Sequence, residues 1–146
     1  MGLSASSRPG TASRVLLVDN DDCVREVTGM ILERMGHCVR ATGSGIEALQ
    51  WLEAEPYDLL IVDVKMPEID GPTFYRDVLA RWPTGGPRVL FISGFAETPD
   101  YENAPEARDV PLLFKPFTIT ELKAALDRRL VTGSAPSADL DLGRRR

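Results

Sequence analysis

Short apolar runs alternate with longer stretches of helical periodicity along the middle of the chain. The runs are rich in β-branched residues and too short for helices, so they predict strands that are buried on both faces of a sheet. The expected strands are residues 14–18, 38–41, 59–62, 88–93 and 112–114. Apolar residues at helical spacing predict helices over residues 23–35, 44–52, 72–82 and 119–130.

Capping signals mark the ends of the predicted helices. Asp22 is the expected N-cap of the first helix, and Gly36 is its expected stop. Two later helices open on pairs with the spacing of a capping box, which are Ser44 with Glu47 and Thr118 with Glu121. The expected apolar face of the first helix consists of Val24, Val27, Met30, Ile31 and Met35.

Strands that alternate with helices predict an α/β fold, a doubly wound sheet of five parallel strands with helices on both faces. Residues 95–109 contain Pro99 and Pro105 and no helical stripe, so at most one short or irregular helix is expected there. Residues 1–13 and 132–146 are mostly small and polar. They predict a disordered amino-terminal arm and a flexible carboxyl-terminal tail around one domain at residues 14–131.

Composition excludes several classes of protein. The chain has 146 residues, 43% of them hydrophobic, which is enough for one sizeable core. A net charge of -5 argues against a general nucleic-acid surface, so no direct nucleic-acid binding is expected. No apolar segment approaches the roughly 18 residues that a membrane helix needs, and the amino terminus lacks the apolar stretch of a signal peptide. We therefore expect a cytoplasmic protein without a membrane partner.

The cysteines and the histidine limit the possible metal chemistry. Cys23 and Cys38 lie in apolar patterns without CxxC spacing, which predicts two reduced core thiols rather than a disulfide or a zinc site. His37 is the only histidine. A single histidine excludes multi-His metal sites and argues against a His-based catalytic triad.

Polar and charged residues stand where the predicted strands end. Asp19 and Asn20 follow the first strand, while Asp63, Ser93 and Lys115 follow or end the third, fourth and fifth. Taken singly, each has an ordinary explanation as a turn residue or a solvent-facing side chain. Because parallel strands end at one edge of the sheet, the side chains are expected to converge, and this convergence favours a functional site.

The converging carboxylates predict phosphoryl transfer with Mg²⁺. Clustered carboxylates repel one another, and a hard divalent cation, an ammonium or a proton can offset this charge. Mg²⁺ fits best because it takes oxygen ligands and is typically held by one or two carboxylates. Asp63 can act as the nucleophile because a carboxylate is already ionised at neutral pH. Asp19 and Asn20 can hold Mg²⁺, while the Ser93 hydroxyl and the Lys115 ammonium can donate to phosphoryl oxygens. The expected product is an aspartyl phosphate.

Four motifs together resemble the receiver domains of two-component response regulators: VLLVDNDD with Arg25 after it, DLLIVDVKMPEIDG, FISG and FKPF. The resemblance covers residues 14–131 and implies a flavodoxin-like sheet with strand order 2-1-3-4-5. It implies that a histidine kinase or histidine phosphotransfer protein phosphorylates Asp63, and that the Lys65 backbone carbonyl is a further metal ligand. It also implies a cis bond between Lys115 and Pro116. Such a protein signals by protein contact and is not an enzyme, since it catalyses only its own phosphorylation and dephosphorylation.

Two positions depart from the family pattern. Asn20 stands where most members carry a second aspartate that contacts the metal, and the loss of one charge should weaken Mg²⁺ binding. Leu112 stands three residues before Lys115, where the family usually has an aromatic switch residue. Without that ring, any output would use backbone or helix shifts.

Three readings of the function follow. The first is a single-domain phosphoacceptor receiver, because residues 1–13 and 132–146 leave no room for a DNA-binding domain. The second is a pseudo-receiver, a protein-binding module that is not phosphorylated, and Asn20 supports it. The third is a phosphatase with an aspartyl-phosphate intermediate. Enzymes of the haloacid dehalogenase type need a second acid two residues after the nucleophile, where this chain has Lys65.

Overall fold

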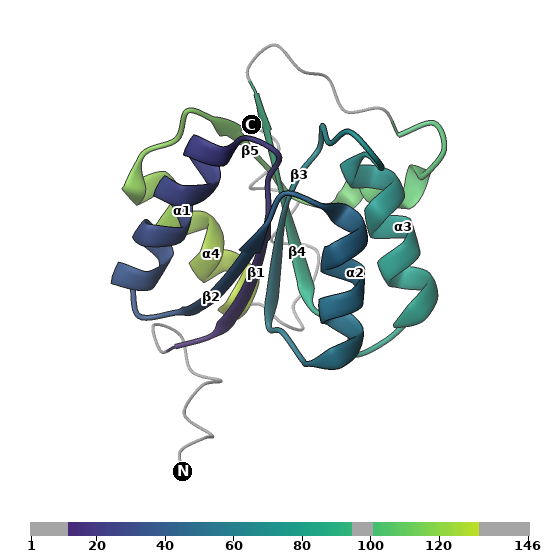
Figure 1. The fold of residues 1–146 in the computed structure, drawn as a ribbon, viewed down its shortest axis with the longest axis horizontal. Coiled ribbons are helices and arrows are strands. Elements are labelled where there is room, and N and C mark those ends of the chain that lie inside the picture. The colour runs from purple at the N-terminus through teal and green to yellow at the C-terminus, as the bar shows by residue number, and fades with distance from the viewer. Residues whose placement is uncertain (1–11, 95–100, 132–146) are drawn as a thin grey trace.

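The computed structural model describes residues 12–94 and 101–131, and their fold is a parallel sheet between two layers of helices (Figure 1). Five strands of this described part pair in the order β2-β1-β3-β4-β5, and every pairing is parallel. The order confirms the expected doubly wound, flavodoxin-like sheet. The strands are β1 Arg14–Val18, β2 Cys38–Thr42, β3 Leu59–Asp63, β4 Arg88–Gly94 and β5 Leu112–Lys115. The helices are α1 Asp22–Arg34, α2 Gly45–Ala54, α3 Gly71–Arg81, η2 Pro105–Asp109 and α4 Ile119–Val131.

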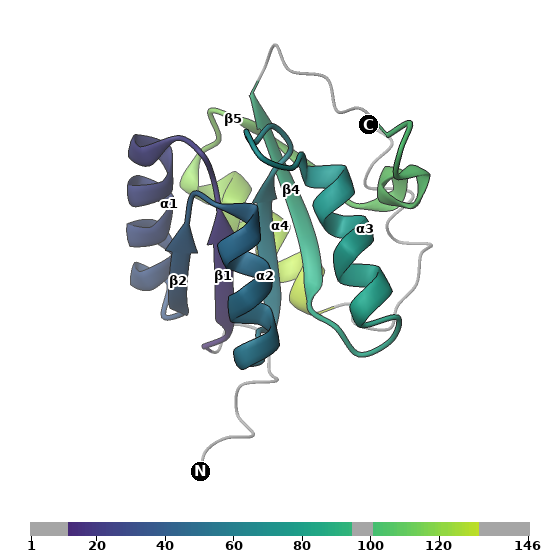
Figure 2. The ribbon, with the colours of Figure 1, turned by 45° about the vertical axis from the view of Figure 1, so that its right-hand side comes forward.

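The helices cover both faces of the sheet. α1 and α4 lie on one face, and α2 and α3 lie on the other (Figures 1 and 2). On the α2 and α3 side, Leu52 and Phe74 pack against strand residues such as Leu60. On the α1 and α4 side, Leu32 and Leu122 pack against the alternate strand residues. All five residues of β3 are buried, because the central strand contacts helices on both sides.

The amino-terminal caps differ from the sequence predictions in detail. The N-cap of α1 is Asp21, whose side chain accepts from the Val24 amide, so the prediction of Asp22 was wrong by one residue. At α2 the Ser44 hydroxyl accepts from the Glu47 amide as expected. The Glu47 carboxylate accepts from the Thr42 hydroxyl instead of reaching back to Ser44, so this capping box is half formed.

Both hydrogen bonds of the predicted box at α4 are present. The Glu121 amide donates to the Thr118 hydroxyl, and the Thr118 amide donates to the Glu121 carboxylate. The stop of α1 at Gly36 is also confirmed, and its φ of 101° favours glycine because other residues are strained in this region.

The predicted inner face of α1 was partly wrong. Val27 and Met30 are 55% and 53% exposed, whereas Thr28 and Leu32 are buried against the sheet. The inner row therefore steps four residues from the half-buried Val24 to Thr28 and on to Leu32. Of the predicted residues, Ile31 and Met35 do pack against the core beside Leu32, so the prediction was right for these two residues and wrong for Val27 and Met30.

Both thiols are free but exposed, so their predicted place in the core was wrong. Cys23 lies on the outer side of the first turn of α1. Cys38 lies in β2, an edge strand in which Thr42 is the only buried residue. An apolar pattern on an edge strand does not place side chains in the core, because only one neighbouring strand and fewer helices cover it.

The described part of the segment between β4 and β5, residues 101–111, has little helix, as expected. Within residues 101–109 the structure has the short 3₁₀ helix η2, which lies beside α3. Arg76 of α3 donates to the carbonyl of Asn103, which lies just before η2. Residues 95–100 lie outside the described residues, and so do the predicted tail at residues 132–146 and residues 1–11 of the predicted arm. The arm was predicted to reach residue 13, but Ser13 is buried and its carbonyl accepts from the Cys38 amide, so that boundary was wrong. No helix in the described ranges is long and apolar enough to cross a membrane.

Candidate functional site

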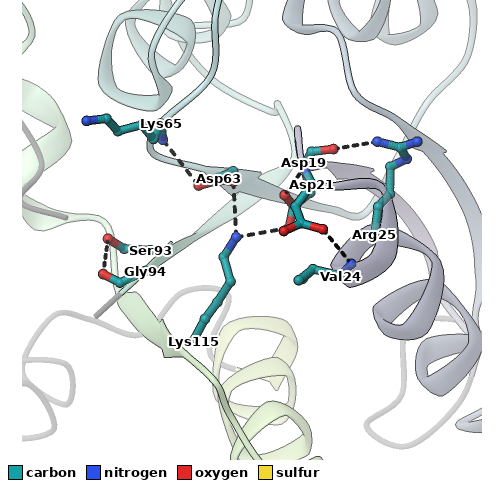
Figure 3. Close-up of polar contacts among 9 residues, drawn as sticks. All are labelled: Asp19, Asp21, Val24, Arg25, Asp63, Lys65, Ser93, Gly94 and Lys115. Atoms are coloured by element: carbon teal, nitrogen blue, oxygen red, sulfur yellow. Dashed lines mark hydrogen bonds and ion pairs between the residues drawn. The ribbon is translucent and has the colours of Figure 1, made fainter. Parts of the chain in front are cut away.

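Three charged side chains from different strands meet at the carboxyl edge of the sheet. Asp19 directly follows β1, Asp63 ends β3, and Lys115 ends β5. The Lys115 ammonium lies 3.2 Å from Oδ2 of Asp63 and 3.4 Å from Oδ2 of Asp19, so one cation bridges two carboxylates (Figure 3). β1 and β3 are neighbours in the sheet, which explains why their terminal carboxylates lie side by side.

Each carboxylate is held by the backbone two residues further on. The Asp21 amide donates to Oδ1 of Asp19 at 2.9 Å, and the Lys65 amide donates to Oδ1 of Asp63 at 3.2 Å. Both are Asx turns, in which an aspartate at a strand end accepts from its own backbone. The turns occupy one oxygen of each carboxylate and leave Oδ2 directed at Lys115 (Figure 3).

Burial makes this pair of carboxylates electrostatically unfavourable. Asp19 is 0% exposed and Asp63 is 3% exposed. Burial and the neighbouring carboxyl of Asp19 raise the pKa of Asp63 from 3.8 to about 7, against the opposing effects of the Lys65 amide and the Lys115 ammonium. The Asp63 carboxyl therefore titrates near neutral pH when no further cation is bound.

The pKa of Lys115 is also raised, and for a lysine this favours the charged form. Burial alone would lower its pKa, but the charges of Asp19 and Asp63 raise the pKa of Lys115 above its ordinary value. The lysine is thus a fixed cation at neutral pH. The site holds two carboxylates and one ammonium, and a proton or another cation is needed to balance it.

Ser93 is close in the sheet but does not contact the three charges. It is fully buried at the end of β4, and its hydroxyl donates to the Gly94 carbonyl at 3.2 Å (Figure 3). A hydroxyl has one proton, so this bond turns the Ser93 donor away from the carboxylates. Its expected role as a donor to a phosphoryl oxygen requires a rotation of this side chain.

The remaining predicted residues lie at the rim. Asn20 is exposed next to Asp19, and Lys65 is exposed in the loop after β3. The Lys115–Pro116 peptide bond is cis, as the family resemblance implied. Leu112, at the position where an aromatic residue was expected, is half-buried and packs against the core on the α2 and α3 side.

The residues of the site could hold a magnesium ion that has few protein ligands and several bound waters. In the described ranges, no three His, Cys, Asp or Glu side chains form a cluster able to hold a metal. The site instead offers the carboxylates of Asp19 and Asp63, with the Asn20 amide and the Lys65 carbonyl close in sequence. Mg²⁺ commonly binds through one or two carboxylates and retains several waters, so this set is sufficient. A divalent cation would also relieve the repulsion that raises the pKa of Asp63.

The sequence did not predict the groups that orient the site residues through hydrogen bonds. The Asp21 amide orients Asp19, and a guanidinium nitrogen of Arg25 donates to the Asp19 carbonyl. The Asx turns could have been predicted, since each aspartate ends an apolar run and precedes turn residues. The contact of Arg25 could not, because helical spacing does not show which way a long side chain lies.

Known proteins with similar sequence or structure share this architecture. Residues 15–127 match the family model described as the response regulator receiver domain. The chain is 34% identical over 128 residues to the sensor kinase CckA of Brucella abortus (strain 2308), in a match that covers 86% of this chain and 13% of that kinase. It is 31% identical over 118 residues to the response regulator receiver protein CpdR of the same strain, covering 81% of this chain and 97% of CpdR. The crystal structure of the Vibrio cholerae chemotaxis protein CheY4 has a TM-score of 0.71 at 26% identity, covering 81% of this chain and 98% of that chain.

Proposed function

The chain belongs to the response regulator receiver domain family, and on that premise we propose that it is a phosphoacceptor whose Asp63 takes a phosphoryl group from phosphohistidine. The observation that carries the proposal is the pairing of a buried Asp63 carboxylate with Asp19 and Lys115 at the carboxyl edge of the sheet. The donor would be a histidine kinase or a histidine phosphotransfer protein. The similarity to part of a sensor kinase and to most of a receiver protein supports a partner of this class.

Each side chain of the site has a task in the proposed reaction. Oδ2 of Asp63 attacks the phosphorus, the new O–P bond forms as the P–N bond of phosphohistidine breaks, and the released imidazole takes up a proton from solvent. Lys115, already 3.2 Å from this oxygen, can donate to a phosphoryl oxygen as the negative charge moves outward. The Lys65 amide holds the other Asp63 oxygen in place during the attack.

Mg²⁺ would be held by Asp19, Asp63, Asn20 and the Lys65 carbonyl, and when bound it would neutralise charge on the transferring group. It would also favour the ionised form of Asp63, because it offsets the charge of Asp19. After transfer, the Ser93 hydroxyl could exchange its bond to the Gly94 carbonyl for a bond to a phosphoryl oxygen. Phosphorylation of Asp63 would then change the hydrogen bonding of the backbone at the end of β4.

The test is incubation of the purified protein with acetyl phosphate and Mg²⁺, followed by intact mass measurement. We expect a phosphoryl-sized mass gain that requires Mg²⁺ and is lost in Asp63→Asn. Asp109→Asn is the matched control, because it neutralises an exposed aspartate on η2. A gain that persists in Asp63→Asn would assign the phosphoacceptor to another residue.

A pseudo-receiver remains the second candidate, because the exposed Asn20 replaces a carboxylate and leaves the site with two acidic ligands. Its signature is the absence of any mass gain at high Mg²⁺ in a protein that still unfolds cooperatively. Asn20→Asp separates the two candidates further. If this variant gains mass and the wild type does not, the missing carboxylate is the reason.

A further inference from the structure

A single arginine joins the first turn of α1 to the end of β1. Nη1 of Arg25 donates to the Asp19 backbone carbonyl at 2.8 Å, and Nη2 donates to the Asp22 carboxylate at 2.7 Å. The planar guanidinium presents its donors in a fixed fork, so the two bonds also fix its orientation (Figure 3 shows the contact with Asp19). The Arg25 side chain is 24% exposed, whereas Asp22 is 88% exposed, so the bond to Asp19 lies on the protected side.

The carbonyl that Arg25 contacts belongs to the peptide bond between Asp19 and Asn20. The direction of that carbonyl sets how the two proposed metal ligands lie relative to each other. The Asp19 amide donates to the Thr42 carbonyl at 3.0 Å, and the Asp21 amide donates to the Asp19 carboxylate at 2.9 Å. With the contact of Arg25, the amide, the side chain and the carbonyl of Asp19 each have a partner.

A glycine on the neighbouring loop leaves room for this contact. A Cβ atom at Gly43 would lie 2.8 Å from Nη1 of Arg25 and 3.5 Å from the Asp19 carbonyl oxygen. The first distance is shorter than real Cβ contacts, so any other residue at position 43 must displace the guanidinium. Gly43 directly follows Thr42, the last residue of β2, so the strand end that pairs with Asp19 is followed at once by the residue that leaves space for Arg25.

We propose that Arg25 is a positioning residue for the Mg²⁺ site, and that Gly43 is required to keep its guanidinium on the Asp19 carbonyl. The inference rests on the proposed function of that site. Arg25 acts through the Asp19–Asn20 peptide and not on the phosphoryl group. It orients the ligands before the metal arrives, as outer-shell partners do in other metal centres.

Two variants remove the same contact from opposite sides. Arg25→Ala deletes the donor, and Gly43→Ala leaves the arginine in the chain but fills its place. The clash in Gly43→Ala is with the end of a long, flexible side chain, so the fold can accommodate it. Gly29→Ala is the matched control, because a Cβ there meets nothing within 4 Å. Arg25→Lys keeps the charge, but an ammonium lacks the planar pair of donors with which the guanidinium contacts both the Asp19 carbonyl and the Asp22 carboxylate.

Two measurements on the full chain test the proposal. The first is calorimetric titration of the metal-free protein with Mg²⁺. We expect the dissociation constant to rise about 3- to 10-fold in Arg25→Ala and Gly43→Ala, to rise less in Arg25→Lys, and to stay unchanged in Gly29→Ala. The second is hydrogen exchange of the Asp21 amide without metal, which should be faster in the first two variants because the Asp19 carboxylate that accepts from it is no longer fixed.

Wild-type Mg²⁺ affinity in either Arg25→Ala or Gly43→Ala, at unchanged thermal stability, would overturn the inference. A wild-type protein that binds no Mg²⁺ would instead contradict the proposed function. In that case the exchange of the Asp21 amide decides whether Arg25 positions Asp19. Unchanged exchange in both variants would overturn that role too.

Discussion

Replacing Asp63 by asparagine should stabilise the metal-free protein, and the gain should grow with pH. In the folded protein the pKa of Asp63 is raised to about 7 from 3.8, mainly by burial and by the carboxyl of Asp19. A group with a raised folded pKa contributes stability that is fully present below its unfolded pKa and is lost as the pH rises through its folded pKa. The wild-type protein should therefore lose stability as the pH rises from roughly 4 to roughly 7, and Asp63→Asn should not.

The structure limits the size of the effect. The interval between 3.8 and about 7 corresponds to about 4 kcal/mol at 1.36 kcal/mol per unit of pKa. This interval already includes the attraction of Lys115, 3.2 Å away, which lowers the pKa of Asp63, so the loss of that ion pair is not deducted a second time. The amide oxygen of the asparagine can still accept from the Lys65 amide. We expect Asp63→Asn to be more stable than wild type by about 2–4 kcal/mol near pH 8.5 and nearly equal to it near pH 4.

The assay is urea denaturation of both proteins at several pH values, followed by far-UV circular dichroism in the presence of a chelator. Asp109→Asn serves as the control, because it removes an exposed negative charge on η2. Saturating Mg²⁺ should narrow the difference at high pH, since ligand binding stabilises the wild-type fold. A stability difference that does not depend on pH would refute the reasoning, and so would a wild type that is the more stable protein at high pH.

Three further changes give separate tests. Asn20→Asp should tighten Mg²⁺ binding about 10-fold in calorimetry, because hard cations favour carboxylates, and unchanged affinity would show that this side chain is not a ligand. Gly71→Ala would bring a Cβ 2.8 Å from the Val64 Cα, so the backbone must move. Denaturation should show a loss of about 1–3 kcal/mol, and wild-type stability would contradict this packing. Burial lowers the pKa of His37, whose Nδ1 accepts from the Ser13 amide. The free energy of unfolding should therefore decrease as the pH drops below roughly 6.5, and His37→Gln should remove this decrease. An equal decrease in both proteins would show that His37 is not its cause.

The strands and the main charges of the site could be predicted because both depend on local sequence. The apolar run before Asp63 and the turn residues after it place a carboxylate at a strand end, and parallel topology then brings it near Asp19 and Lys115. The family motifs added the strand order and the cis bond before Pro116.

The direction in which a side chain points from its helix or strand could not be predicted from the sequence in the same way. Val27 and Thr28 are adjacent on α1, and hydropathy favours the valine for the core, yet the threonine is the buried one. The Ser93 hydroxyl lies at the expected strand end but donates to Gly94. In both cases the result depends on which neighbour fills the space, and a one-dimensional pattern does not contain that information.

The bridge between Lys115 and the two carboxylates has a consequence for how the protein folds. Lys115 is separated by 96 residues from Asp19 and by 52 from Asp63 along the chain. Closing such long loops is slow compared with forming local contacts, and a ribosome delivers β5 last of the five strands. Until β5 docks, the aspartates at the ends of β1 and β3 face each other without their ammonium. Acid or a divalent cation should therefore favour the pairing of β1 with β3 before β5 docks, and the ion pairs of Lys115 form only when all three of these strands are in place.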